Sequence, residues 1–156
     1  MSDLRPDTAG VIAPPPLVFG AAVGIGLLLN RARPLPILPP AVGKPLGAVL
    51  AAAGIGLGLA AVRALQGAGT NVDPYEQTSA IVESGPYGFS RNPIYVAMGL
   101  LGAGIGLLAN AGWILALLPA AVAVVQKGVV EREEAYLTRL FPDAYPAYKG
   151  RVRRWF

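Results

Sequence analysis

The sequence has 156 residues, of which 54% are hydrophobic and only 14% are charged, and its formal net charge is +4. A soluble domain averages about 25% charged residues, so this composition indicates a chain embedded in lipid. The absence of cysteine and histidine excludes disulfides, thiolate nucleophiles, imidazole bases and a zinc centre, and we expect no metal site. We also expect no nucleic-acid partner, because seven of the 13 basic residues follow the last apolar stretch, where they would lie beside lipid headgroups.

Four apolar stretches predict an all-α fold, an integral membrane helical bundle with about four transmembrane helices. We treat residues 1–156 as a single membrane domain. The stretches are rich in Gly and Ala, which suits close helix packing in lipid. The expected spans are approximately residues 14–30, 43–65, 93–109 and 111–127.

The connections between these spans differ in kind. Asn30–Pro45 contains five prolines and predicts an extended or re-entrant connector. Residues 66–92 form a long polar loop, whereas Asn110 predicts a tight turn that makes the last two spans a helical hairpin. Residues 128–156 form a charged tail that begins with an amphipathic helix and ends in a segment rich in Tyr and Arg.

The distribution of basic residues predicts the orientation of the bundle. Ten of the 13 Lys and Arg residues fall in the N-terminus, the second loop counted from Arg63 to Asn92, and the tail counted from Lys127, and three fall on the other side. The positive-inside rule therefore predicts that both termini and the 66–92 loop are cytoplasmic. The Ala-, Gly- and Arg-rich composition suggests a bacterial inner membrane.

The segment Ser84–Tyr95, SGPYGFSRNPIY, is the first candidate for chemistry. In structural terms it is a Gly-Pro turn followed by a helix that starts at Pro93, with Arg91 anchored to headgroups. In functional terms it places an Arg, an Asn and two Tyr at the mouth of an apolar hairpin. That combination can hold a carboxylate and face a cation.

Three further patterns allow both structural and functional interpretations. Val129–Phe141 brings acidic residues next to the membrane, although a solvated amphipathic helix would also explain it. Phe141–Trp155 has the aromatic and basic residues of an interfacial anchor. The Gly102-x-Gly104 step follows no strand, so a dinucleotide-binding motif is excluded and helix packing is the default interpretation.

From about Thr70 to Trp155, the chain resembles the isoprenylcysteine carboxyl methyltransferase and phospholipid methyltransferase group of membrane enzymes. That group combines a Gly-Pro-Tyr turn, an Arg-His-Pro-x-Tyr motif, an apolar hairpin, a Glu-Glu pair, a Phe-x-x-x-Tyr-x-x-Tyr motif and a basic end. The matching residues here are Gly85-Pro86-Tyr87, Arg91-Asn92-Pro93-Ile94-Tyr95, Glu133-Glu134, Phe141, Tyr145, Tyr148, Arg151 and Arg154.

The resemblance implies a methyltransferase that uses S-adenosylmethionine and a lipophilic or small acceptor (a carboxylate, an amine or a thiol). It implies that Arg151, Arg154 and Tyr95 are catalytic, with the two arginines closing the site. It also implies a cofactor-binding set in the loop, the third span and the tail: Tyr87, Arg91, Asn92, Pro93, Tyr95, Gly102, Gly104, Glu133 and Glu134.

Asn92 stands where many members of that group carry His. An amide can donate and accept hydrogen bonds but does not titrate near neutral pH, so we expect Asn92 to position the cofactor and to move no proton. Two alternatives are a small membrane transporter or scaffold, and a membrane reductase that uses a nicotinamide cofactor. The lack of an ionisable residue within the apolar stretches argues against a transporter.

Overall fold

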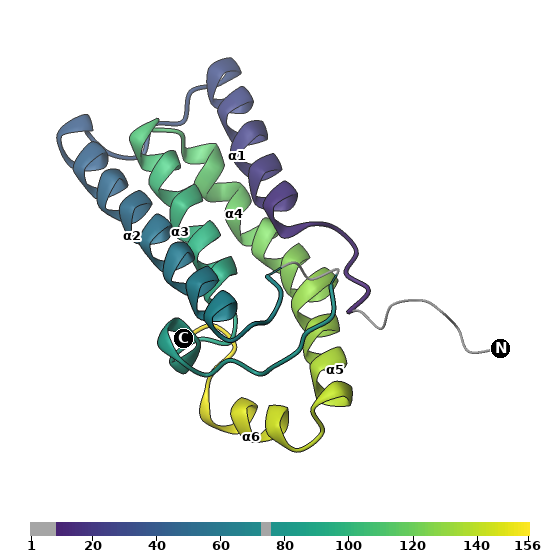
Figure 1. Cartoon of the computed structure of the whole chain (residues 1–156). Helices are drawn as coiled ribbons and strands as arrows, with labels where there is room; N and C mark the ends of the chain where they lie inside the picture. Colours follow the sequence, from purple (N-terminus) through teal and green to yellow (C-terminus); the bar gives the residue numbers. More distant parts are fainter. Residues whose placement is uncertain (1–8, 73–75) are drawn as a thin grey trace.

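The computed structural model describes residues 9–72 and 76–156, and within these ranges it contains helices and no strand. In chain order the elements are α1 (Pro15–Ala32), α2 (Pro40–Gly67), the 3-10 turn η1 (Gly85–Gly88), α3 (Pro93–Leu108), α4 (Gly112–Val125), the π-helical segment η2 (Gln126–Val130), α5 (Glu131–Leu140) and α6 (Ala144–Arg151). Helices α1 to α4 run side by side as a bundle, and α5 continues the line of α4 (Figure 1).

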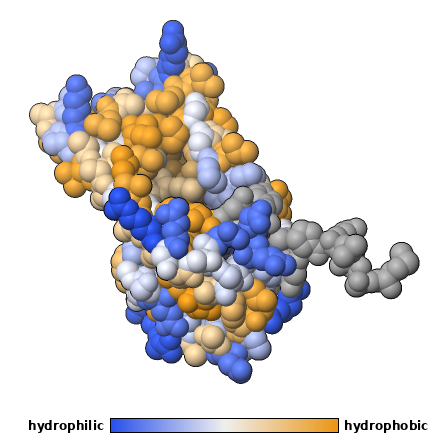
Figure 2. All heavy atoms as spheres, in the orientation of Figure 1, coloured by the Kyte–Doolittle hydropathy of each residue, from blue (hydrophilic) through white to orange (hydrophobic). Residues whose placement is uncertain are grey.

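The bundle has the dimensions and the surface of a membrane protein. Within the described residues, three helical segments are long and apolar enough to cross a bilayer: Pro15–Ala32, Pro40–Gly67 and Gly112–Leu140. Large apolar side chains such as Leu17 and Leu28 lie about two thirds exposed on α1, at 67% and 70%. Figure 2 shows hydrophobic residues over the bundle and hydrophilic ones towards its two ends. The chain is therefore a helical membrane protein.

The third expected span, residues 93–109, corresponds to α3 and is the short one. It has 16 residues, or about 24 Å at 1.5 Å per residue, which is less than the roughly 30 Å hydrocarbon core. It packs closely against α2, where a Cβ added to Gly54 would lie only 2.8 Å from the carbonyl oxygen of Ala97. Small residues bring the two backbones together in the way that the composition predicts.

The last long helical segment extends beyond a bilayer. About 20 residues cover the hydrocarbon core, so a span that begins at Gly112 ends near Glu131. The charged helix α5, Glu131–Leu140, therefore lies outside the spanning part. It shares one end of the bundle with η1 and α6 (Figure 1). We call this the polar end.

The proline-rich connector is shorter than the sequence predicts. We expected Asn30–Pro45 to be extended, but α1 continues to Ala32 and α2 begins at Pro40, with Pro45 inside the helix. The tight turn between α3 and α4 lies at the same end of the bundle as this connector, and in it Asn110 has a positive φ of 48°. Its Oδ1 accepts a hydrogen bond from the backbone N of Ile37 at 2.8 Å, so the connector is fixed to the turn.

Candidate functional site

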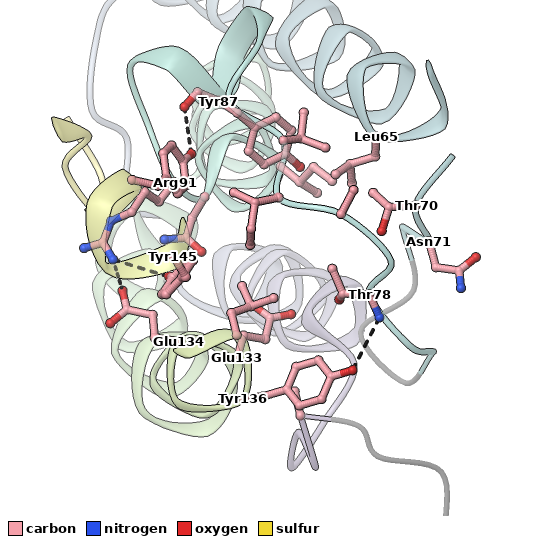
Figure 3. A pocket seen from close by; sticks show the side chains of 18 of the residues that line it. Leu65, Thr70, Asn71, Thr78, Tyr87, Arg91, Glu133, Glu134, Tyr136 and Tyr145 are labelled. Atoms are coloured by element: carbon pink, nitrogen blue, oxygen red, sulfur yellow. Dashed lines mark hydrogen bonds and ion pairs between the residues drawn. The ribbon is translucent and has the colours of Figure 1, made fainter. Parts of the chain in front are cut away.

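A pocket of about 880 Å³, part of it open to solvent, lies at the polar end of the bundle (Figure 3). Its walls come from the end of α2, the segment 70–82, η1, the start of α3, and helices α5 and α6. Charged and aromatic side chains occupy one part of it, and Thr70, Asn71, Thr78 and Tyr136 lie in another (Figure 3). The lining also includes apolar side chains: Leu65, Ile81, Val82, Ile94 and Leu137.

Arg91 enters the pocket from the segment just before α3. Its backbone N donates a hydrogen bond to the carbonyl oxygen of Arg153 at 3.0 Å, which fixes its place beside the C-terminal segment. The side chain is only 8% exposed and forms an ion pair with Glu134, with 3.0 Å between Nη1 and Oε1. Its Nε is buried and has no hydrogen-bond partner among the described residues. A buried donor without a partner is costly, so Arg91 is a candidate for contact with an anionic ligand.

Glu134 is surrounded by cations. Arg154 donates to both of its carboxylate oxygens, from Nε at 2.8 Å and from Nη2 at 2.9 Å, and Lys149 lies 3.7 Å away. Burial alone would raise the pKa of this carboxyl, but the hydrogen bonds from Arg154 and the charges of Arg91 and Lys149 hold it below its ordinary value. Both oxygens are occupied, so Glu134 organises the site and keeps Arg91 in position.

Glu133, the neighbouring acid, has a different environment. It points towards the pocket (Figure 3), and its Oε1 accepts a hydrogen bond from the Tyr95 hydroxyl at 2.9 Å. Burial raises the pKa of the Glu133 carboxyl to about 7; the Tyr95 hydrogen bond opposes this rise, and the charge of Glu134 adds to it. Within the described residues, Glu133 is the carboxylate of the pocket that no cation neutralises.

Asn92 joins the pocket to the C-terminal segment. Its Nδ2 donates to the carbonyl oxygen of Arg154 at 2.9 Å, and Ser90 Oγ donates to the same oxygen at 3.4 Å. Further along, Trp155 Nε1 donates to Gln126 Oε1 at 3.1 Å. The end of the chain is therefore held between the start of α3 and the end of α4. Asn92 still lines the pocket, although its donor group is used by the protein itself.

Of the residues expected to bind the cofactor, the structure brings Tyr87, Arg91, Asn92, Tyr95, Glu133 and Glu134 into the pocket wall. It does not bring Pro93, Gly102 and Gly104 there. Pro93 is fully buried at the first turn of α3. A Cβ added to Gly102 would lie 2.9 Å from Leu118 Cδ2, and one added to Gly104 would lie 2.5 Å from the backbone N of Ala51. In this structure both glycines lie at tight helix contacts and outside the pocket lining, and their expected part in admitting the cofactor stays a prediction.

The two arginines expected to be catalytic also lie outside the pocket lining. Arg151 is 60% exposed at the end of α6 and pairs with Glu83 on the surface. Arg154 lies behind Glu134, where its guanidinium binds the carboxylate and its carbonyl oxygen accepts from Asn92. Arg154 therefore acts through Glu134, and Arg151 secures α6 against the loop.

Several pocket residues were not among the expected site residues. Tyr145 and Tyr148 matched the family pattern, but they lie buried on α6 and not in an exposed interfacial anchor. Tyr148 donates to the carbonyl oxygen of Tyr87 at 2.7 Å. Tyr136 accepts from the backbone N of Thr78 at 3.4 Å (Figure 3). The helical spacing of Glu133, Tyr136 and Leu137 is the signal that would have found Tyr136, because residues three and four apart share a helix face.

Comparison with known proteins gives one family. The family model described as phospholipid methyltransferase matches residues 43–144, which is more than half of the chain. The match includes the loop motif, the hairpin and the Glu133–Glu134 pair, and it ends before Arg151 and Arg154. No curated protein matches the chain, and no solved structure does.

Proposed function

This chain belongs to the phospholipid methyltransferase family, and on that premise we propose that it transfers a methyl group from S-adenosylmethionine to a lipophilic acceptor at the membrane surface. When bound, S-adenosylmethionine supplies an electrophilic methyl group on a sulfonium centre. The observation that carries the proposal is Arg91, which lines the pocket together with Tyr87, Tyr95 and Glu133 and whose buried Nε has no hydrogen-bond partner among the described residues.

The pocket residues suit the chemistry of this donor. Arg91 has a buried donor for a carboxylate, which agrees with the amino-acid end of the molecule. Tyr87 and Tyr95 present aromatic rings to the same space, and a cation near such rings is stabilised. The apolar lining and the polar groups at Thr70, Asn71 and Thr78 suit the nucleoside end.

The protein's part in such a transfer is alignment and exclusion of water. Methyl transfer from a sulfonium is an in-line displacement that needs no covalent enzyme intermediate. Arg91 and Asn92 would orient the polar end of the donor, with Glu134, Lys149 and Arg154 holding Arg91 in place. Glu133 would face a cation in the reaction space, either the ammonium of the donor or a protonated acceptor amine.

The bundle gives the two reactants separate routes. The polar end is open to solvent at the pocket, where a charged donor can enter, and the apolar bundle lies against lipid, from which an acceptor can arrive. We place this end in the cytoplasm, together with both termini, on the distribution of basic residues. The composition supports a bacterial inner membrane as its location.

Isothermal titration of the purified protein with S-adenosylhomocysteine tests the proposal. We expect wild-type protein to bind and Arg91→Ala to bind roughly 30-fold or more weakly, because losing one partner of a desolvated charged contact costs about 2 to 5 kcal/mol. Arg151→Ala is the matched control, since its exposed ion pair with Glu83 lies outside the pocket. A transporter, or a reductase that binds only a nicotinamide cofactor, would not bind this ligand, and failure of wild-type protein to bind would overturn the proposal.

A further inference from the structure

We propose that Glu133, held by Tyr95, is the catalytic base that takes the proton from an amine acceptor before methyl transfer. The inference rests on the proposed function and gives Glu133 a role toward the acceptor, beyond the cofactor binding expected from the sequence. It starts from the hydrogen bond in which the Tyr95 hydroxyl donates to Glu133 Oε1 at 2.9 Å.

The chemistry of an amine acceptor requires a base. A protonated amine has no lone pair with which to attack a methyl group, whereas a carboxylate or a thiolate attacks as it stands. In the first step, the acceptor ammonium would give one proton to the Glu133 carboxylate and leave a neutral amine and a neutral carboxylic acid. In the second step, the amine nitrogen would bond to the methyl carbon as the carbon–sulfur bond breaks and its electrons remain on sulfur. Glu133 would then release its proton to solvent through the open mouth of the pocket.

No other pocket group within the described residues suits this task. The chain has no histidine, and Asn92 occupies the position where many relatives carry one. Glu134 is a poor base because Arg91, Arg154 and Lys149 hold it as a carboxylate. Burial raises the pKa of Tyr87, Tyr145 and Tyr148 above the ordinary value, so these hydroxyls keep their protons near neutral pH, while the Tyr95 hydroxyl is the hydrogen-bond donor to Glu133. Glu133 alone combines an oxygen facing the pocket with freedom from a cationic partner.

The surroundings of Glu133 also favour this role. The charged and titratable groups that face it are Tyr95 on α3, Tyr87 on η1, Tyr145 on α6, Arg91 before α3 and Glu134 on its own helix. Burial raises the pKa of its carboxyl to about 7; the hydrogen bond from Tyr95 opposes this rise and the charge of Glu134 adds to it, so the group can both accept and release a proton near neutral pH. Tyr95 also packs against the apolar core of the bundle, which holds its ring in place beside Glu133.

The test uses the full-length protein, labelled S-adenosylmethionine, and vesicles that contain phosphatidylethanolamine, with a fatty-acid carboxylate as an acceptor that needs no base. We expect the wild-type rate on the amine to fall below pH 7, as Glu133 becomes protonated. Glu133→Gln should lose this acidic limb and lower kcat about 100-fold or more, while binding of S-adenosylhomocysteine stays within about tenfold. Glu131→Gln, an exposed residue on the same helix, is the matched control and should behave as wild type.

A second variant tests the part played by Tyr95. Its hydrogen bond lowers the pKa of Glu133, so Tyr95→Phe should move the acidic limb to higher pH, a shift that a purely structural role would not produce. The inference is overturned if Glu133→Gln keeps the wild-type rate and pH profile on the amine, or if its loss of rate follows a loss of donor binding. It is also overturned if the wild-type protein methylates carboxylates and no amine. A wild-type protein that neither binds S-adenosylhomocysteine nor transfers a methyl group would instead overturn the proposed function.

Discussion

Asn92 and Arg154 are joined by a hydrogen bond of 2.9 Å from the side-chain amide of Asn92 to the backbone carbonyl oxygen of Arg154, across 62 positions of sequence. We therefore expect Asn92→Ala to lower the stability of the protein by about 1 kcal/mol, since a net hydrogen bond is worth about that much. Asn92→His retains a ring N–H that can donate, and its affinity for S-adenosylhomocysteine should stay within about tenfold of wild type, or roughly 1.4 kcal/mol. Thermal unfolding in detergent and isothermal titration measure the two effects. Loss of binding in Asn92→Ala without a change in unfolding would show that the amide serves the ligand and not the C-terminal segment.

Glu134 provides a second prediction about stability. Glu134→Ala would leave the buried Arg91 charge without its carboxylate, and breaking such a pair costs about 3 kcal/mol or more. Glu131→Ala removes only a 3.9 Å pair with Arg154 at an exposed position, so it should cost less than about 1 kcal/mol. Unfolding of both variants under the same conditions gives the comparison. Equal losses of stability in the two would mean that solvent screens Glu134 as effectively as Glu131.

Gly104 tests whether the glycines of α3 serve packing. An added Cβ at Gly104 meets the backbone of α2 at 2.5 Å, and overpacking of this kind costs about 1 to 3 kcal/mol. At Gly99, on the same helix, an added Cβ has nothing within 4 Å. We expect Gly104→Ala to lower the unfolding temperature and Gly99→Ala to leave it unchanged or slightly raised. The folded fraction of Gly104→Ala should bind S-adenosylhomocysteine normally, and selective loss of binding would return this glycine to the cofactor site.

The orientation of the bundle can be tested with single cysteines, because the chain has none of its own. Glu76→Cys and Thr138→Cys flank the pocket on the loop and the tail, whereas Arg33→Cys lies in the connector at the opposite end. We expect a membrane-impermeant thiol reagent added outside intact cells to label Arg33→Cys and to spare the other two until the cells are opened. Labelling of Glu76→Cys or Thr138→Cys in intact cells would contradict a cytoplasmic pocket.

The helices and many of the pocket residues could be predicted from the sequence, because both depend on local sequence patterns. The apolar stretches predicted the bundle, and the family motifs predicted the pocket positions of Tyr87, Arg91 and Glu133. The sequence did not separate Glu133 from Glu134, although one points into the pocket and the other towards three cations. That difference depends on contacts with Arg91 and Arg154, which lie far apart in the sequence.

Gly104 and Arg151 lie outside the pocket lining for a related reason. A motif records which residues recur together, and it does not tell whether a residue contacts the ligand or another helix. Gly104 is required by the backbone of α2, and Arg151 is engaged by Glu83 in the loop. The segment Asn30–Pro45 also differs from its sequence-based prediction, because α2 begins at Pro40 and includes Pro45. The rest of the connector is held by a hydrogen bond to Asn110 in the turn between α3 and α4. Contacts between residues that lie far apart in the sequence cannot be predicted from a local sequence pattern.

The π-helical segment Gln126–Val130 determines in which direction around the helix axis the side chains of α5 point. The backbone N–H of Glu131 donates to the carbonyl of Gln126 five residues earlier, so this turn holds more residues than an α-helical one. Each residue of an α-helix advances the side-chain direction by about 100°, from 3.6 residues per turn. Removing one residue here would restore an α-helical turn and rotate Glu133 by about that angle, away from Tyr95. The wide π-helical turn thus changes the direction in which the side chains of α5 point relative to those of α4. One continuous helical segment can therefore expose apolar side chains to lipid along α4 and direct a carboxylate to the pocket from α5.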